Sequence, residues 1–305
     1  MRITALAAIG LALLPRALAN NPLEDAFVQN DVSNNGGYEV AFASRPLWHF
    51  GRSGGNNPCY PSAALIDGKQ HGTNPDTFPH AGTGCPDPGP GGGTGTAFPT
   101  YFTVGFCGGD ELRVTYNIYF SHDGFSNGVI AKGHMHDWER IIVIWRRENG
   151  QWSRKELLKS FHTGGYDSYM HDNWNAVQNT IEYNNPDEQD GKDKDGAKIY
   201  VGWGKHAMFA QRNTGWNDEA SQGCGREFRS GRDWWYDSLP FAIIIRLHAE
   251  LFSRYLPTRS DMINAAPGST DGDTLSTFDW GSADSGPWVI APKVCDAKEG
   301  GFTAC

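Results

Sequence analysis

The sequence predicts a mainly β protein: a single-domain β-sandwich with a few flanking helices. Residues 112–120 (LRVTYNIYF) alternate well and are rich in Val, Ile, Tyr and Phe, which is typical of a strand. Residues 140–145 (RIIVIW) are almost continuously apolar, which indicates a central strand covered on both faces. The pair Asn149-Gly150 then predicts a hairpin turn into the segment 151–162 (QWSRKELLKSFH).

The chain starts with the pattern of a secretory signal peptide. Arg2 is followed by an apolar run over residues 3–14, and a small-residue pattern, Ala-Leu-Ala, occupies residues 17–19. The alternative is a membrane anchor, but the apolar run is too short to span a bilayer. We therefore expect cleavage after Ala19 and a secreted, extracellular protein without a transmembrane helix.

The charge of the chain restricts its partners. The net charge is −9 over 305 residues, and loss of the two arginines of the leader makes the mature chain more acidic still. An acidic surface argues against nucleic acid as a partner and against simple electrostatic capture by anionic lipid. Any membrane contact must then be specific or bridged by a metal.

Residues 20–106 form a region rich in Gly, Pro and Asn, and residues 86–99 are of such low complexity that we expect a loop. Cys59 and Cys85 bracket part of this region, so a disulfide is expected to tether it; the alternative is a disordered linker. The main sandwich is predicted over 107–305, in one domain with the ordered part of 20–106. Six cysteines allow three disulfides in 15 connectivities: Cys59, Cys85, Cys107, Cys224, Cys295 and Cys305.

Three further segments complete the predicted elements. Residues 197–210 (AKIYVGWGKHAMFA) predict another strand. Residues 238–256 predict a helix, with Ser238 as N-cap and Pro240 in its first turn. Residues 187–196 (DEQDGKDKDG) resemble a calcium loop, but glycines fall where carboxylates belong, which favours a solvated acidic turn.

Two carboxylates lie close together in residues 133–139 (GHMHDWE). Alternate residues of a strand share a face, so Asp137 and Glu139 can converge on one cation without distortion. Neighbouring carboxylates repel each other unless a cation or a shared proton compensates them, so the pair favours a metal. His134 must reach the site from a bend before the strand, and Gly133 supplies a backbone able to make one.

The loop that ends at Gly133 carries Asp123 near its start. A loop between adjacent strands returns close to its origin, so Asp123 is expected to supply a third oxygen. Such an oxygen-rich site with one imidazole suits Mg²⁺, Ca²⁺ or Mn²⁺ better than Zn²⁺ or Cu²⁺. His136 would face the other way and anchor local structure. The alternative is a hydrogen-bonded loop without a metal.

Residues 133–139 resemble the GHRHDWE heptapeptide of the necrosis- and ethylene-inducing peptide-like proteins, which are secreted microbial cytolysins. Residues 116–123 (YNIYFSHD) are similar to that family's tyrosine-rich strand, which ends in YFPKD. Residues 160–169 (SFHTGGYDSY) and 202–209 (GWGKHAMF) resemble two further segments of the family. The resemblance covers roughly residues 107–210, in the family's order.

The resemblance implies a β-sandwich similar to that of the actinoporin-type toxins of sea anemones. It implies binding to glycosylated inositol phosphorylceramide, a sphingolipid of the plant plasma membrane, followed by membrane permeabilisation and necrosis, by a monomer with no catalytic residue. The implied metal ligands are Asp123, His134, Asp137 and Glu139. The residues expected to line the headgroup cavity are His136, His162, Trp203 and His206.

Two departures from the family pattern bear on function. Met135 replaces the heptapeptide arginine, which removes a charge and a bidentate donor. Ser121-His122 replaces Pro-Lys before Asp123.

Two alternatives to a cytolysin stay open at this point. A non-toxic glycan- or sphingolipid-binding relative would bind without causing leakage, which the Met135 departure makes credible. A metal-dependent hydrolase would use Asp137 and Glu139 to hold the metal and His136 as base. The sequence contains no GxSxG elbow, P-loop or HExxH motif, which favours a protein that is not an enzyme.

Overall fold

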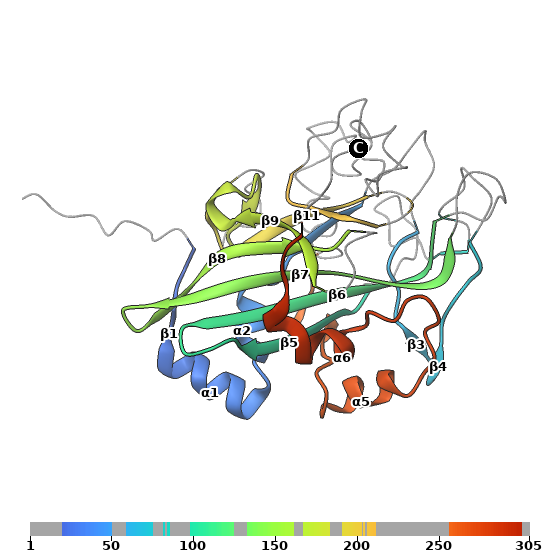
Figure 1. The fold of residues 1–305 in the computed structure, drawn as a ribbon, viewed down its shortest axis with the longest axis horizontal. Helices are drawn as coiled ribbons and strands as arrows, with labels where there is room; N and C mark the ends of the chain where they lie inside the picture. The colour runs from blue at the N-terminus through green and yellow to red at the C-terminus, as the bar shows by residue number, and fades with distance from the viewer. Residues whose placement is uncertain are drawn as a thin grey trace, which may run out of the picture.

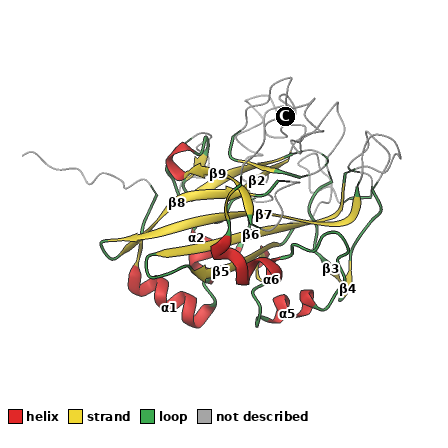
Figure 2. Cartoon of the chain, in the orientation of Figure 1, coloured by secondary structure: helices red, strands yellow, loops and turns green. Residues whose placement is uncertain are grey.

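The fold is seen in a computed structural model of the chain, drawn in Figures 1 and 2. The residues that the structure describes are 20–50, 59–75, 82, 84–85, 98–124, 133–161, 167–183, 191–202, 204, 206–211 and 256–300.

The main sheet has eight strands within the described residues, in the order β13-β5-β6-β7-β8-β9-β14, with β1 paired to β8. The neighbours from β5 to β9 are antiparallel, whereas β13 and β14 join the two edges in parallel. Its strands are β1 (Leu23–Glu24), β5 (Thr100–Phe106), β6 (Glu111–Asp123), β7 (His134–Glu148), β8 (Gln151–Lys159), β9 (Ser168–Asn173), β13 (Met262–Asn264) and β14 (Lys298–Glu299).

A second sheet packs on the main one. Its order is β10-β11-β12, with β2 paired in parallel to β11. Its strands are β2 (Leu47–Phe50), β10 (Thr180–Ile181), β11 (Gly196–Val201) and β12 (Met208–Phe209). Side chains from both sheets share one buried core, in which Tyr116 and Val143 of the main sheet cluster with Trp48 and Ile199 of the second. Two sheets around a common core make a β-sandwich, so the predicted fold class is confirmed.

The remaining elements border the main sheet (Figures 1 and 2). A short hairpin lies beside the end of the sheet where β6 stops and β7 starts. Helices α1, α5 and α6 lie along the lower side in both views, and no helix among the described residues has the length and apolarity needed to cross a membrane. These elements are α1 (Asp25–Asn35), α2 (Tyr38–Ala43), β3 (Leu65–Ile66), β4 (Lys69–Gln70), η1 (Trp174–Ala176), η3 (Arg259–Asp261), α5 (Thr270–Ser276), α6 (Pro287–Ile290) and η4 (Ala291–Asp296).

A buried arginine ties the N-terminal segment to both sheets. The Nη1 of Arg154 on β8 donates to Asn20 Oδ1 at 3.0 Å and pairs with Asp195 Oδ1 at 3.4 Å, just before β11. Its Nη2 donates to the carbonyl of Ala43 at the end of α2, and the guanidinium lies 4.2 Å from the centre of the Trp145 ring. Because the side chain is only 1% exposed, these partners replace the water it has lost.

Most local predictions in the described residues are confirmed. The hairpin turn at Asn149 and Gly150 joins β7 to β8, and both residues have the positive φ (53° and 78°) of a type I′ turn. The disulfide between Cys59 and Cys85 is present, and Cys107 pairs with Cys295. Three predicted features lie wholly or partly outside the described residues: the helix 238–256 up to residue 255, any disulfide of Cys224 or Cys305, and the start of the acidic turn 187–196.

Two predictions were wrong. The single strand expected over 197–210 is two antiparallel strands, because Gly204 and His206 both take positive φ (94° and 65°) and the chain reverses there. Strands were also expected only after Cys107, whereas β5 precedes it and occupies an inner position of the main sheet.

Candidate metal centre

The candidate site lies where β6 ends and β7 begins, at the rim of the space between the two sheets. The ladder places Asp137 opposite Phe120 and Glu139 opposite Ile118, and both apolar partners belong to the core between the sheets. Directly opposed residues share a face, so both carboxylates point toward the second sheet, as predicted from strand alternation. Each residue is only 7% exposed.

A left-handed residue brings Asp123 to this face. His136 has a φ of 63°, and the β6–β7 ladder pairs Phe120 with Asp137 and next His122 with Met135, with no pair between them. In a regular ladder Asp123 would face away from Asp137, because Asp123 lies three positions after Phe120, the residue opposite Asp137. The left-handed residue breaks this alternation. The bend that we expected at Gly133 is therefore at His136.

His136 is held in this conformation by an aromatic cluster on the outer face of the main sheet. Its Nδ1 lies 2.6 Å from the Tyr119 hydroxyl, and its ring meets the Trp280 ring edge to face at 5.2 Å. Burial lowers the pKa of His136, so the ring is neutral over more of the pH range. Trp138 lies in the same cluster and is 1% exposed, as expected for a core residue.

His206 joins the carboxylates from the turn between β11 and β12. Its Nδ1 lies 2.9 Å from Asp137 Oδ2, and its ring stacks on Phe120 with the centroids 3.7 Å apart. Ligand atoms of Asp123, Asp137 and His206 all lie within 4.8 Å of one another, and all three residues are buried. This group could hold a metal ion. From the sequence, His206 is expected to line the headgroup cavity rather than to bind the metal.

His134 completes the solvent side of the site. Its Nδ1 lies 2.8 Å from the His136 carbonyl, which can only accept, so Nδ1 carries the proton. In the neutral ring Nε2 is then an acceptor, yet it lies 3.4 Å from Asp123 Oδ2, another acceptor. Two acceptors at this distance call for a cation or a further proton between them. Two ligands bound to one small cation are about 3 Å apart, so the spacing suits a shared metal.

The pKa of Glu139 is raised by its surroundings. Burial raises the pKa of Glu139 well above its ordinary value of 4.5, and the nearby carboxylates of Asp137 and Asp123 raise it further. The Ser160 hydroxyl donates to Glu139 Oε2 and opposes the shift. Of the predicted ligands, Asp123 and Asp137 lie in the buried group with His206, whereas Glu139 and His134 lie outside that group. Two carboxylates and an imidazole are a donor set that fits a divalent cation.

The other predicted site residues are placed as follows. His162 and Trp203 lie outside the described residues. His136 lies in the aromatic cluster described above. Met135, between two of the histidines, is 39% exposed and points toward solvent rather than into the core.

No protein-family model matches the chain, and no curated protein matches it. Nine chains of solved structures match, and three of them are 17–18% identical to this chain. They are the non-toxic HaNLP3 protein (17% identity, 67% of this chain and 82% of that one, TM-score 0.38), NLPPya in complex with mannosamine (18%, 72% and 90%, 0.36) and Necrosis and Ethylene inducing Protein 2 from the causal agent of cocoa's Witches Broom disease (18%, 79% and 91%, 0.38).

The chain is similar to these necrosis- and ethylene-inducing-type proteins. At such identities and TM-scores, the likeness decides neither ligand nor activity.

The raised pKa of Glu139 predicts how stability depends on pH. In the folded state without metal, the Glu139 carboxyl keeps its proton to a higher pH than in the unfolded chain. The stability contributed by the neutral carboxyl is therefore fully present below pH 4.5 and is lost as the pH rises through the folded-state pKa. Glu139→Gln keeps the neutral shape, so the variant should lose less stability over this range. Urea unfolding at a series of pH values, in chelator, measures the difference. Equal losses in both proteins would contradict the assignment.

Proposed function

We propose that the chain is a secreted, metal-dependent cytolysin-like protein that is not an enzyme. In this proposal it binds the glycosylated inositol phosphorylceramide headgroup of plant plasma membranes and permeabilises the membrane. The observation that carries the proposal is the buried group of Asp123, Asp137 and His206, beside Glu139, at the rim of the sandwich. The resemblance of residues 133–139 to the family heptapeptide supports Asp137 and Glu139 as ligands and adds His134.

The expected role of each site residue follows from its exposure. Asp137 and Glu139 are buried and would hold the cation from the protein side. The His134 side chain is 31% exposed and marks the side from which a headgroup would approach. A bound divalent cation offers exchangeable positions to hydroxyl and phosphate oxygens. An acidic protein could bind an anionic lipid in this way without a basic surface.

The non-toxic binding protein is the second candidate, and Met135 favours it. Met135, which is 39% exposed, stands where the family heptapeptide has an arginine, so one cationic contact to an anionic headgroup is absent. The hydrolase is less well supported, because its base would be His136. That ring is bound to Tyr119 in the aromatic cluster, on the face opposite Asp137.

Dye release separates these candidates. Vesicles with plant glycosylated inositol phosphorylceramides are mixed with protein in Mg²⁺ or Ca²⁺ and then in chelator, with vesicles lacking the glycolipid as control. The proposal expects leakage only with both the glycolipid and the metal. Metal-dependent binding in a vesicle flotation assay without leakage would establish the non-toxic candidate instead. If the folded protein shows no binding and no leakage, the proposed lipid is rejected.

A further inference from the structure

The β6–β7 ladder is interrupted at Ser121, two residues before Asp123, and resumes with the pairs His122–Met135 and Asp123–His134. Because His136 is left-handed, the ladder skips the pair between Ser121 and His136. Ser121 and His122 immediately precede Asp123, so their position sets where its carboxylate lies. The interruption leaves Ser121 to be fixed by a segment other than β7.

A segment of the N-terminal region bonds β6 at and near the missing pair. The Thr73 N–H donates to the Ser121 carbonyl at 3.0 Å. The Thr73 hydroxyl lies 2.9 Å from the Ser121 hydroxyl and 2.7 Å from His122 Nδ1. Ser62 donates its N–H to the Tyr119 carbonyl at 2.9 Å, two residues earlier on β6. Thr73 therefore holds both residues that lead into Asp123.

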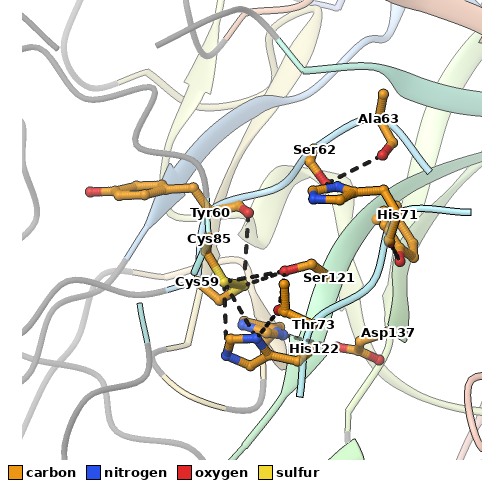
Figure 3. Close-up of a disulfide and its surroundings, with 12 residues drawn as sticks. Cys59, Tyr60, Ser62, Ala63, His71, Thr73, Cys85, Ser121, His122 and Asp137 are labelled. Atoms are coloured by element: carbon orange, nitrogen blue, oxygen red, sulfur yellow. Dashed lines mark hydrogen bonds and ion pairs between the residues drawn. A yellow bond between two sulfur atoms is a disulfide. The ribbon is translucent and has the colours of Figure 1, made fainter. Parts of the chain in front are cut away.

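The disulfide lies against the same two residues. Cys85 Sγ is 3.4 Å from the Ser121 hydroxyl and 3.6 Å from His122 Nδ1, and Cys59 Sγ is 3.7 Å from the Ser121 hydroxyl. Figure 3 shows the two sulfurs facing Ser121 and His122, with Thr73 beside them. The disulfide joins two cysteines that are 26 residues apart in sequence. Thr73 lies between them, so it belongs to the loop that the disulfide closes. The disulfide thereby limits how far Thr73 can move from β6.

We propose that Thr73, held by the Cys59–Cys85 disulfide, is a positioning residue that fixes Asp123 for metal binding through Ser121 and His122. The inference rests on the metal centre of the proposed function. It also gives Ser121-His122, which replaces the Pro-Lys of the family pattern, a specific role: these side chains bond the Thr73 hydroxyl, which proline cannot do. Removal of the hydroxyl, or release of the loop, should weaken metal binding.

Two variants of Thr73 test the hydroxyl directly. Thr73→Val keeps the shape and the backbone N–H bond to Ser121 but removes the hydroxyl, whereas Thr73→Ser keeps the hydroxyl. Mn²⁺ affinity, measured by titration with electron paramagnetic resonance of the free ion, should fall about tenfold in Thr73→Val, as for loss of other residues that orient metal ligands. Thr73→Ser should bind like the unmodified protein.

A purely structural role for Thr73 gives a different result. It would lower the melting temperature of Thr73→Val in chelator and leave the Mn²⁺ affinity and the Mn²⁺-induced rise in melting temperature unchanged. That outcome would overturn the positioning role while leaving the proposed function standing. Absence of Mn²⁺ binding by the unmodified protein would instead overturn the metal centre itself.

The disulfide provides an independent test. A thiol reductant supplies two electrons and two protons to the cysteine sulfurs and is itself oxidised to a disulfide. Reduction releases the loop and should weaken Mn²⁺ binding. Cys59→Ser/Cys85→Ser, which lacks the disulfide, should bind Mn²⁺ as weakly without any reductant. Cys107→Ser/Cys295→Ser, which removes the other described disulfide, should keep the full affinity. Equal affinities in both double variants would contradict the proposal.

Discussion

Asp137→Asn is expected to lower the affinity for a divalent cation by about a hundredfold or more, because it removes a charged ligand and not merely a residue that orients one. Asparagine has nearly the same shape, so the fold should persist. The change also relieves the repulsion between the carboxylates of Asp137 and Glu139, so stability in chelator should not fall. Isothermal titration with Mn²⁺ and urea unfolding in chelator measure the two effects.

The matched control is Asp271→Asn, which removes one carboxylate from an exposed position on α5. It changes the net charge by the same amount, so it should leave Mn²⁺ affinity unchanged. A similar loss in both variants would indicate a diffuse effect of net charge. Undiminished binding by Asp137→Asn would mean that the metal does not bind at this rim.

Arg154→Met is expected to destabilise the protein by about 3–5 kcal/mol, because it leaves Asp195 buried without its cationic partner. Asn20 and the Ala43 carbonyl lose their donor at the same time. The loss should appear as a lower urea midpoint in unfolding followed by tryptophan fluorescence. Metal affinity per folded molecule should not change, since the arginine lies outside the candidate site.

The double variant Arg154→Met/Asp195→Asn separates the ion pair from the rest of the network. Neutralising Asp195 removes the unpaired buried charge, so the double variant should be more stable than Arg154→Met alone. A loss below about 1 kcal/mol for Arg154→Met would place its pair among weak surface ion pairs and contradict the burial argument.

The strands that could be predicted from the sequence are those with strong local signals. Alternation over 112–120, the apolar run 140–145 and the Asn149-Gly150 turn each depend on nearby residues, and all appear as expected. The helix α1 gave no such signal, because its sequence (DAFVQNDVSNN) has few apolar residues at helical spacing. The composition of 20–106 hid β2 and β5, since glycine and proline between them suggested a loop throughout.

The candidate site was predictable in part for the same reason. Asp137 and Glu139 share a face by local alternation, and that geometry is present. The bend at His136 could not be predicted, because a left-handed histidine is stabilised by Tyr119 and Trp280, which are distant in sequence. His206 depends likewise on the turn between β11 and β12, which the sequence suggested only as continuous strand.

Anomalous scattering from crystals grown with Mn²⁺ would locate the metal itself. We expect one strong anomalous peak within about 2.5 Å of carboxylate oxygens of both Asp123 and Asp137. An imidazole of His134 or His206 should contact the same ion. A peak elsewhere with none between these carboxylates, or no peak at a saturating Mn²⁺ concentration, would contradict the metal centre.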